Sequence, residues 1–294
     1  MPLAPSPPES SRVGVAVVTR DRARELLGVL PRLEALPERP PIVVVDNAST
    51  DGTVRLLAER HPEVPVIALG ENRGAQARNL AVERLGTPYV AFSDDDSWWE
   101  PGALAESRML LERHPRLGAV AARVLLDEDG SEDPVCRAMA ASPIRSPHPL
   151  PGPRVLGFVA CGVVVRREAF LAVGGFHARY GIGGEEELLA IDLAEAGWDI
   201  AYVSSLNAHH RPAASRDRPA RRRRQVRNAL WSSWLRRPAS VALGRTVPVL
   251  ARALRDPSAR GGLTDALRGL PWVLGERRRV GPRVEAALLA LEAA

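Results

Sequence analysis

Short apolar runs alternate with longer helical patterns over the first two thirds of the chain, and this alternation limits the possible folds more than any other feature. Four runs rich in valine and isoleucine are VGVAVVT at 13–19, PIVVVD at 41–46, VPVIAL at 64–69 and YVAFSD at 89–94. A helical pattern follows each run before the next begins. Apolar strands separated by helices are typical of a parallel sheet that helices cover on both faces. The pattern therefore predicts an α/β, doubly wound, mainly parallel sheet.

A second block of apolar runs and then a series of helices complete the chain. The runs lie at 117–126, 158–166 and 198–203, with a proline-rich loop at 130–155 and a helix from Glu185. After His210 the strand patterns stop, and prolines separate several helical segments. We expect four parts: a disordered lead (1–11), two halves of a sheet domain (12–115 and 116–210) and a C-terminal helical, basic extension (211–294).

The charge of the chain is concentrated at its C-terminal end. Residues 209–294 contain 19 arginines and six acidic residues, whereas the whole chain of 294 residues has a net charge of only +5. A basic segment of this kind suits contact with phosphate, an anionic membrane surface or nucleic acid.

Composition excludes several other classes of protein. No apolar stretch approaches the ~20 residues that a membrane-spanning helix needs, and the N-terminus lacks the pattern of a secretory signal. We therefore expect a cytoplasmic protein. Cys136 and Cys161 are the only cysteines, and their spacing indicates neither a disulfide framework nor a cysteine-type zinc site.

Polar residues follow each of the first four apolar runs. They are Thr19, Arg20 and Asp21, then Asp46 and Asn47, then Asn72, Arg73 and Gly74, and finally Asp94, Asp95 and Asp96. Each cluster alone also fits a turn, a loop or a helix cap. In an open parallel sheet, however, the carboxyl ends of the strands lie along one edge, where ligands bind. The four clusters together therefore predict a binding site.

The acidic triplet at 94–96 indicates the chemistry of this site. Adjacent carboxylates at the end of an apolar strand repel one another unless a cation or hydrogen-bond donors compensate them. Mg²⁺ and Mn²⁺ take oxygen ligands and commonly need only one or two carboxylates besides the substrate's phosphates. The chain has no G-x-x-x-x-G-K-[ST] loop, and TRDRAR stands where a dinucleotide fold would have G-x-G-x-x-G. These absences argue against an ATPase and a dehydrogenase.

Five ordered segments resemble those of the bacterial family 2 glycosyltransferases, which have the GT-A fold. They are VVTRDRAREL, VVVDNASTDGT, ENRGAQARNLA, FSDDDSWWEPGAL and CGVVVRREAFLAVGGFHARYGIGGEEELLAIDLAEAGW, between about residues 12 and 210. The resemblance implies a hexosyl- or deoxyhexosyltransferase of polysaccharide biosynthesis that uses a UDP-, GDP- or dTDP-sugar. It implies an inverting reaction in which a carboxylate deprotonates the acceptor hydroxyl. Residues 12–115 would bind the nucleotide-sugar, and 116–210 the carbohydrate or lipid-linked acceptor.

The same resemblance assigns roles to individual residues. Those expected to contact the nucleotide-sugar are Thr19, Arg20, Asp46, Arg73, Gly74, Arg78, Asp94 and Asp95. Asp96, with Asp95 and with His209 or His210, would hold a divalent Mn²⁺ or Mg²⁺. Gly162, Gly184, Trp98 and Trp99 are candidates for the acceptor side, although both tryptophans equally suit ordinary packing.

The general base is expected among the three glutamates at 185–187. Family spacing back from Gly197 selects Glu186, with Glu185 beside it. The motif departs from the family pattern, because Leu188 stands where a second acid is usual and the arginine further along the helix is missing. A simpler reading is that the glutamates stabilise a helix N-terminus. The departure leaves open a catalytically inert sugar-nucleotide binder or scaffold.

The basic extension has its own alternatives. Over 218–238 the sequence RPARRRRQVRNALWSSWLRRP places Leu230, Trp231, Trp234 and Leu235 on one helical face among arginines. This composition suits an interfacial helix on an anionic membrane, and it equally suits a helix packed on the sheet domain. We expect the extension mainly to localise the enzyme. Nucleic-acid binding through arginine and tryptophan is a less favoured alternative.

Overall fold

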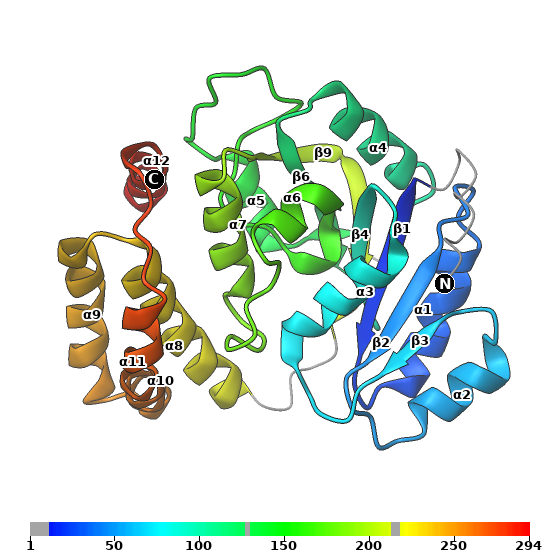
Figure 1. The fold of residues 1–294 in the computed structure, drawn as a ribbon, viewed down its shortest axis with the longest axis horizontal. Helices are drawn as coiled ribbons and strands as arrows, with labels where there is room; N and C mark the ends of the chain where they lie inside the picture. Colours follow the sequence, from blue (N-terminus) through cyan, green and yellow to red (C-terminus); the bar gives the residue numbers. More distant parts are fainter. Residues whose placement is uncertain (1–11, 127–129, 213–217) are drawn as a thin grey trace.

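The computed structural model describes residues 12–126, 130–212 and 218–294 (Figure 1). The lead expected at 1–11 lies outside the described residues. A mixed nine-stranded sheet forms the centre of the molecule, with the strand order β3-β2-β1-β4-β8-β6-β9-β5 and with β7 paired to β6. The expected α/β sheet domain with a helical C-terminal extension is therefore confirmed.

The first half of the sheet is parallel, as the sequence predicts. Its strands are β1 (Val13–Thr19), β2 (Ile42–Asp46), β3 (Val66–Ala68) and β4 (Tyr89–Asp94). β1 pairs in parallel with β2 on one side and with β4 on the other. The helices between them are α1 (Ala23–Glu34), α2 (Thr53–Arg60) and α3 (Ala77–Leu85), the last preceded by a 3-10 turn at Gly74–Gln76.

The second half of the sheet is mixed. β6 (Leu117–Leu126) and β9 (Asp199–His210) are parallel to each other, but β8 (Val163–Arg166) runs antiparallel to both β4 and β6. β5 (Ser97–Trp99) pairs antiparallel with the end of β9, and β7 (Ser131–Glu132) with the end of β6. The expected strand at 198–203 therefore continues to His210, which places both histidines inside a strand.

Helices cover both faces of the sheet because the strand side chains alternate between two apolar cores. Val15 and Val17 face α1 and α4 (Ala103–Arg113), whereas Ala16 faces the side of α3. That second side also carries α5 (Pro134–Ala140), α6 (Arg167–Ala172) and α7 (Glu185–Glu195). α5 lies within the segment that the sequence predicts as a loop.

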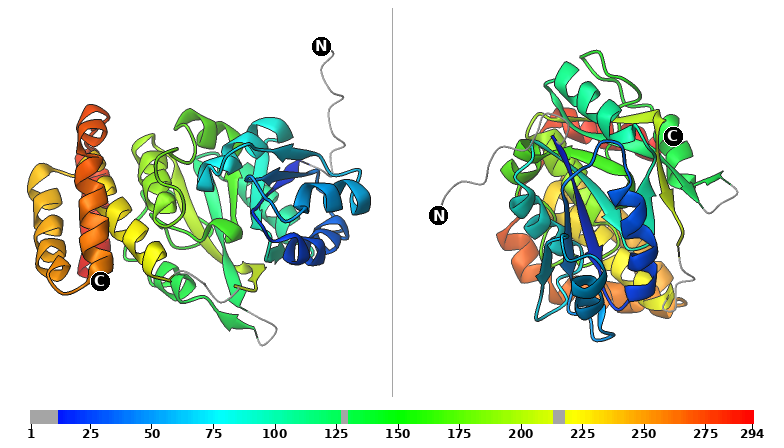
Figure 2. Two further views of the ribbon diagram at one scale, coloured as in Figure 1. Left: turned by 90° about the horizontal axis from the view of Figure 1, so that it is seen from below. Right: turned by 90° about the vertical axis from the view of Figure 1, so that its right-hand side faces the viewer.

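The extension forms a layer of five helices at one end of the molecule, opposite α1 and α2 (Figures 1 and 2). These helices are α8 (Arg218–Arg236), α9 (Ala239–Ala253), α10 (Pro257–Arg268), α11 (Leu270–Gly275) and α12 (Pro282–Ala293). None of the helices that the structure describes combines the length and the apolar character needed to cross a bilayer.

The apolar face of α8 packs inside the protein. Leu230, Trp231 and Leu235 are buried among Leu188 of α7 and residues of α10 and α11, and Trp234 packs against the same cluster. This face is therefore not available to a membrane, and the alternative of a helix packed on the sheet domain holds. Because Trp231 and Trp234 pack in this cluster, they are not available to stack on nucleic-acid bases.

Arg237 links α8 to α12 through buried charge. Its side chain is 1% exposed, and its guanidinium binds Glu285 at 2.6 and 2.9 Å and Glu292 at 2.6 Å. Breaking a buried ion pair leaves the remaining charge uncompensated, which costs more than an exposed pair contributes. The extension therefore depends on Arg237 for its internal packing.

We expect Arg237→Met to lower the free energy of unfolding by roughly 3 kcal/mol, because Glu285 loses its charged partner and Glu292 keeps only Arg245, while the volume is kept. Urea denaturation followed by circular dichroism measures this. Arg283→Met, at an exposed arginine of α12, is the matched control and should change little. Equal effects of the two substitutions would show that the buried network does not stabilise the extension.

Candidate active site

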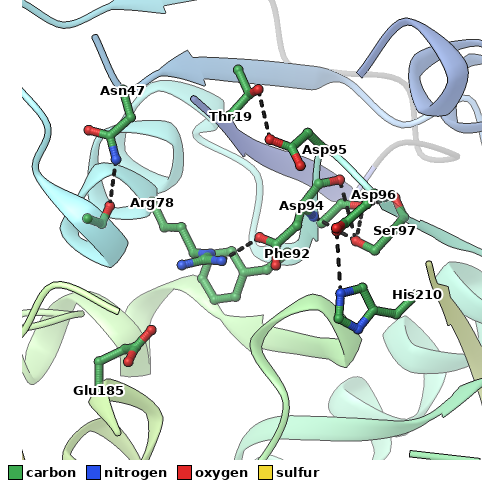
Figure 3. Close-up of polar contacts among 12 residues, drawn as sticks. Thr19, Asn47, Arg78, Phe92, Asp94, Asp95, Asp96, Ser97, Glu185 and His210 are labelled. Carbon is green, nitrogen blue, oxygen red and sulfur yellow. Dashed lines mark hydrogen bonds and ion pairs between the residues drawn. The ribbon is translucent and has the colours of Figure 1, made fainter. Parts of the chain in front are cut away.

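The carboxyl ends of β1, β2 and β4 meet at one edge of the sheet. Thr19 lies opposite Asp46, and Val18 lies opposite Asp94, in the strand register. The Thr19 hydroxyl donates a hydrogen bond to Asp95 Oδ2 at 2.9 Å, which joins the first strand to the acidic triplet (Figure 3). The structure thus brings three of the four predicted polar clusters into one place.

Asp46 presents an acceptor that has no partner. The residue is 2% exposed, and its Oδ2 accepts the Ser49 N–H at 3.0 Å. Its Oδ1 is buried and has no hydrogen-bond partner among the described residues. A buried acceptor without a partner is costly, so Asp46 is suited to receive a donor group from a ligand.

Asn47 holds the next cluster beside it. Its side-chain oxygen accepts the Arg73 N–H at 2.7 Å, and its amide donates to the Gly74 carbonyl at 3.0 Å. Gly74 has a φ of 57°, and a Cβ there would lie 2.6 Å from the Gly181 Cα. Only glycine fits this approach. The contact brings the two halves of the sheet domain together.

The three carboxylates of the triplet point to different partners. Asp94 binds the buried guanidinium of Arg78. Asp95 binds Thr19 and the Nε of Arg22 at 3.0 Å, and Asp96 binds Arg22 Nη2 at 2.9 Å. Arg22 therefore bridges Asp95 and Asp96 in the free chain and partly compensates their repulsion.

The two bridged carboxylates differ in their proton affinity. Burial, together with the charges of Asp96 and Asp94, raises the pKa of Asp95 to about 7 despite Arg22. Burial opposes ionisation of Asp96 as well, but the hydrogen bond and charge of His210, with Arg22, lower the pKa of Asp96 overall. Asp96 is therefore the carboxylate that stays ionised near neutral pH.

His210, not His209, lies beside the triplet. Its Nε2 is 3.4 Å from Asp96 Oδ1, and the negative charge of Asp96 raises the pKa of His210 against the opposing effect of burial. His209 points to the other face of β9, as alternation along a strand requires. There it contacts Glu100 at 3.2 Å and stacks on Trp98. The expectation of His209 as a metal ligand is therefore corrected.

The residues around Asp96 fit a metal that binds together with a phosphate ligand. Within the described ranges no group of three or more His, Cys, Asp or Glu side chains is assembled for a metal. Asp96 and His210 nevertheless offer an oxygen and a nitrogen side by side. Mg²⁺ and Mn²⁺ keep several waters and take further oxygens from a bound phosphate, so two protein ligands can suffice.

The three glutamates of α7 diverge because successive helical residues lie about 100° apart. Glu185 is buried, turns back to accept the Gly183 N–H and faces Arg78 across the site (Figure 3). Glu187 faces the extension, where Arg245 lies 3.8 Å away. Glu186 and Glu187 both line a pocket of about 310 Å³ with Gly184.

Glu186 has the proton affinity of a base that works near neutral pH. Burial, followed by the charge of Glu185, raises the pKa of Glu186 to about 8, although Arg78 acts in the opposite direction. The rest of its pocket is mainly apolar and includes Met139, Leu156, Phe158 and Leu291. The pocket therefore places a proton acceptor beside space for an apolar or amphiphilic molecule.

Several expected site residues lie elsewhere. Trp99 is buried and donates its indole N–H to the Phe92 carbonyl at 3.1 Å, which is a packing role. Trp98 stacks on His209, lies under Arg32 and lines a pocket together with Asp95 and Asp96. Gly162 is required by packing, since a Cβ would lie 2.4 Å from Val124. The acceptor role expected for Trp99 and Gly162 is therefore corrected, whereas that of Trp98 stays a prediction.

Two expected nucleotide contacts are exposed in the free chain. Arg20 lies 3.6 Å from Asp21, and Arg73 lies 3.3 Å from Glu71. Both side chains are at the mouth of the site and are not held against Asp46. Gly184 lines the same pocket as Glu186, and its acceptor-side role stays a prediction.

The extension contributes to the site in a way that the sequence did not indicate. Asn228 of α8 is fully buried and donates to the carbonyls of Tyr180 and Gly183 at 3.1 and 2.7 Å. Arg236 binds Asp192 of α7 with two hydrogen bonds. α8 thus fixes the loop and helix that carry the glutamates.

The matching sequence family and relatives agree with this geometry. A profile described as "Glycosyl transferase family 2" matches residues 15–174. The N-acetylglucosaminyl-diphospho-decaprenol L-rhamnosyltransferase of Mycobacterium tuberculosis (strain CDC 1551 / Oshkosh) is 30% identical over 238 residues, covering 69% of this chain and 77% of the relative. The putative teichuronic acid biosynthesis glycosyltransferase TuaG of Bacillus subtilis (strain 168) is 39% identical over 77 residues, 24% of this chain and 31% of its own length.

Solved structures support the fold over nearly the whole chain. The mannosyltransferase PcManGT from Pyrobaculum calidifontis, in complex with GDP-Man and Mn²⁺, superposes with a TM-score of 0.61 at 22% identity, covering 99% of this chain and 88% of its own. TarS 1-349 of S. aureus, in complex with UDP-GlcNAc, has a TM-score of 0.61 at 16% identity and covers 95% and 88%. The fold is of the GT-A type.

The raised pKa of Glu186 predicts a pH-dependent difference in stability. The folded chain keeps this proton up to about pH 8, whereas an ordinary glutamate releases it near 4.5. The stabilising contribution is therefore complete below pH 4.5 and is lost progressively as the pH rises to about 8. Glu186→Gln does not titrate, so its melting temperature should rise relative to the parent chain by more than about 2 °C between pH 5 and pH 8.5. A difference that stays constant with pH would contradict the raised pKa.

Proposed function

We propose that this chain, which belongs to glycosyl transferase family 2, transfers a sugar from a nucleotide-diphosphate sugar to a carbohydrate or lipid-linked acceptor with inversion at the anomeric carbon. The observation that carries the proposal is the position of Glu186. It lies outside the part of the chain that the family profile matches, lines a pocket and interacts electrostatically with Arg78, the partner of Asp94. A scaffold without activity would not need a glutamate whose pKa lies near neutrality.

The donor nucleotide is proposed to bind along the carboxyl ends of β1, β2 and β4. The unpartnered Oδ1 of Asp46 suits an N–H group of the base. Asp94 and Arg78 lie where the ribose and diphosphate would follow, and Arg20 and Arg73 are free to close over them from the mouth of the site. Complexes of structural neighbours hold GDP-Man or UDP-GlcNAc, which supports this class of donor without identifying the nucleotide.

A divalent ion is proposed to join the donor diphosphate to Asp96 and His210. When bound, it would neutralise the charge that develops on the departing diphosphate. Arg22 now bridges Asp95 and Asp96, so we expect it to shift when the ion binds. Asp95 has a pKa of about 7 in the chain alone. The positive charge of the ion would lower this pKa, so that Asp95 would release its proton to solvent.

The acceptor is proposed to enter the pocket beside Glu186. Its hydroxyl would give its proton to the Glu186 carboxylate as it attacks the anomeric carbon, and the nucleoside diphosphate would leave with the electron pair of the broken bond. The relative from M. tuberculosis is named for an acceptor on diphospho-decaprenol, and the mainly apolar lining of the pocket suits a lipid-linked glycan. A cytoplasmic site of action remains our prediction.

Donor binding should require the divalent ion, because diphosphate and three carboxylates otherwise face one another. We expect calorimetric affinity for the binding member of a UDP-, GDP- and dTDP-sugar panel to fall at least about tenfold in EDTA, and to return with Mn²⁺. Asp96→Asn should lose the Mn²⁺ dependence and most of the activity, whereas Asp265→Asn on α10 is the matched control. Undiminished affinity in EDTA would remove the metal from the proposal.

Glu186→Gln should lower turnover by on the order of 10²–10⁴-fold, because glutamine keeps the size of the side chain but cannot accept the proton. Donor affinity should be nearly unchanged. Glu187→Gln, in the same pocket but with Arg245 3.8 Å from its carboxylate, is the comparison and should be mild. A loss at Glu185 instead would shift the base by one residue, and normal turnover in all three variants would show that the base lies elsewhere.

A further inference from the structure

One face of α9 carries exposed apolar side chains that no described part of the chain covers. Leu243 and Val247 are each 55% exposed, Leu250 is 48% exposed and Leu254, just after the helix, is 79% exposed. Their spacing of four, three and four residues places them on one side of the helix. Single exposed leucines are ordinary, but a contiguous row of four exposed apolar side chains is typical of an interaction surface.

No charged residue interrupts this row over three helical turns. The other exposed residues between Ala242 and Arg252 are Gly244, Pro248 and Ala251. The one arginine within this stretch, Arg245, turns inward and binds Glu292 of α12. We call Leu243, Val247, Leu250 and Leu254 the α9 stripe.

Arginines border the α9 stripe at its C-terminal end. Arg252 and Arg255 are exposed beside Leu254, and Arg222 of α8 approaches from the neighbouring helix. Arg252 and Arg222 share a single carboxylate, that of Asp256, at 3.2 and 3.4 Å. The border therefore has more positive than negative charge, which suits an anionic partner.

The position of α9 leaves the stripe open to a large flat partner. α9 is the outermost helix of the extension in two perpendicular views, with α8 between it and the sheet (Figures 1 and 2). A second copy of this chain is a poor occupant, because α9 has no acidic side chain that could pair with the arginines of the other copy. Lipid headgroups combine negative phosphate with apolar chains a few ångströms below.

We propose that α9 docks the protein on an anionic lipid bilayer, with the α9 stripe among the acyl chains and Arg252, Arg255 and Arg222 at the headgroup phosphates. At 15 residues the helix is too short to span a bilayer, and its exposed apolar row beside arginines suits a helix that lies in the interface. The docking surface is thus α9, and not the α8 face on which the sequence places it. This inference does not depend on the donor, the acceptor or the base.

Flotation of the full chain with vesicles tests the proposal without any enzymatic reaction. Vesicles of phosphatidylcholine with about 30 mol% phosphatidylglycerol should carry the protein upward in a density gradient at low salt, and phosphatidylcholine alone should carry much less. Val247→Gln/Leu250→Gln should weaken partitioning at least about tenfold. Val54→Gln/Met109→Gln, at exposed apolar residues of α2 and α4, is the matched control and should float like the parent.

The charged border has its own pair of variants. Arg252→Gln/Arg255→Gln should lose most of the preference for anionic vesicles, whereas Arg113→Gln/Arg116→Gln, exposed on the far side of the sheet domain, should keep it. Circular dichroism melting confirms that each variant is folded. Equal flotation of the parent and the stripe variant would overturn the proposal. A dimer of the parent in sedimentation velocity, lost in the stripe variant, would also overturn it by assigning the stripe to a second copy.

Discussion

Compensation of the three carboxylates at the end of β4 is the constraint on which the site depends. The sequence puts Asp94, Asp95 and Asp96 on consecutive positions, and the chain supplies each with a partner from a different element. Arg78 comes from α3, Arg22 from the turn before α1, and His210 from the end of β9. These contacts hold four distant segments together at one edge of the sheet. The binding site and the local stability of the domain therefore have the same physical cause.

The elements of the first half could be predicted from the sequence because their signal is local. An apolar strand buried on both faces is a run of valine and isoleucine, and β1, β2 and β4 begin and end within a residue of the predicted runs. The position of the polar residues that follow these strands could be predicted with a single rule, namely that the carboxyl ends of parallel strands lie along one edge of the sheet. The antiparallel insertion of β8 between β4 and β6 depends on which strands pair, and a run of three valines carries no information about that.

The site residues that sequence reasoning missed are those whose role depends on a long-range contact. Arg22 and Asn47 stood in the recognised clusters, but only the fold shows that one bridges two carboxylates and the other holds the loop at Gly74. The sequence predicts a strand that ends at residue 203, and this prediction does not show which of His209 and His210 faces the acidic triplet. Once β9 reaches His210, alternation decides between them. Asn228 lay in a segment read as an appendage, and nothing in its sequence marks it as a support for the Gly183 loop.

The arginines and tryptophans of α8 predict a helix that faces a membrane, but the structure buries its apolar face. α8 has the arginines and tryptophans of an interfacial helix, but its apolar side is needed to cover Leu188 and Tyr180 beside the glutamates of α7. α9 has a weaker signal in sequence, since its apolar residues are leucine and valine and its arginines are few. Packing of the α8 face against α7 leaves α9 on the outside, because α8 then lies between α9 and the sheet (Figures 1 and 2). The same packing therefore fixes the catalytic helix and determines which face of the extension meets its surroundings.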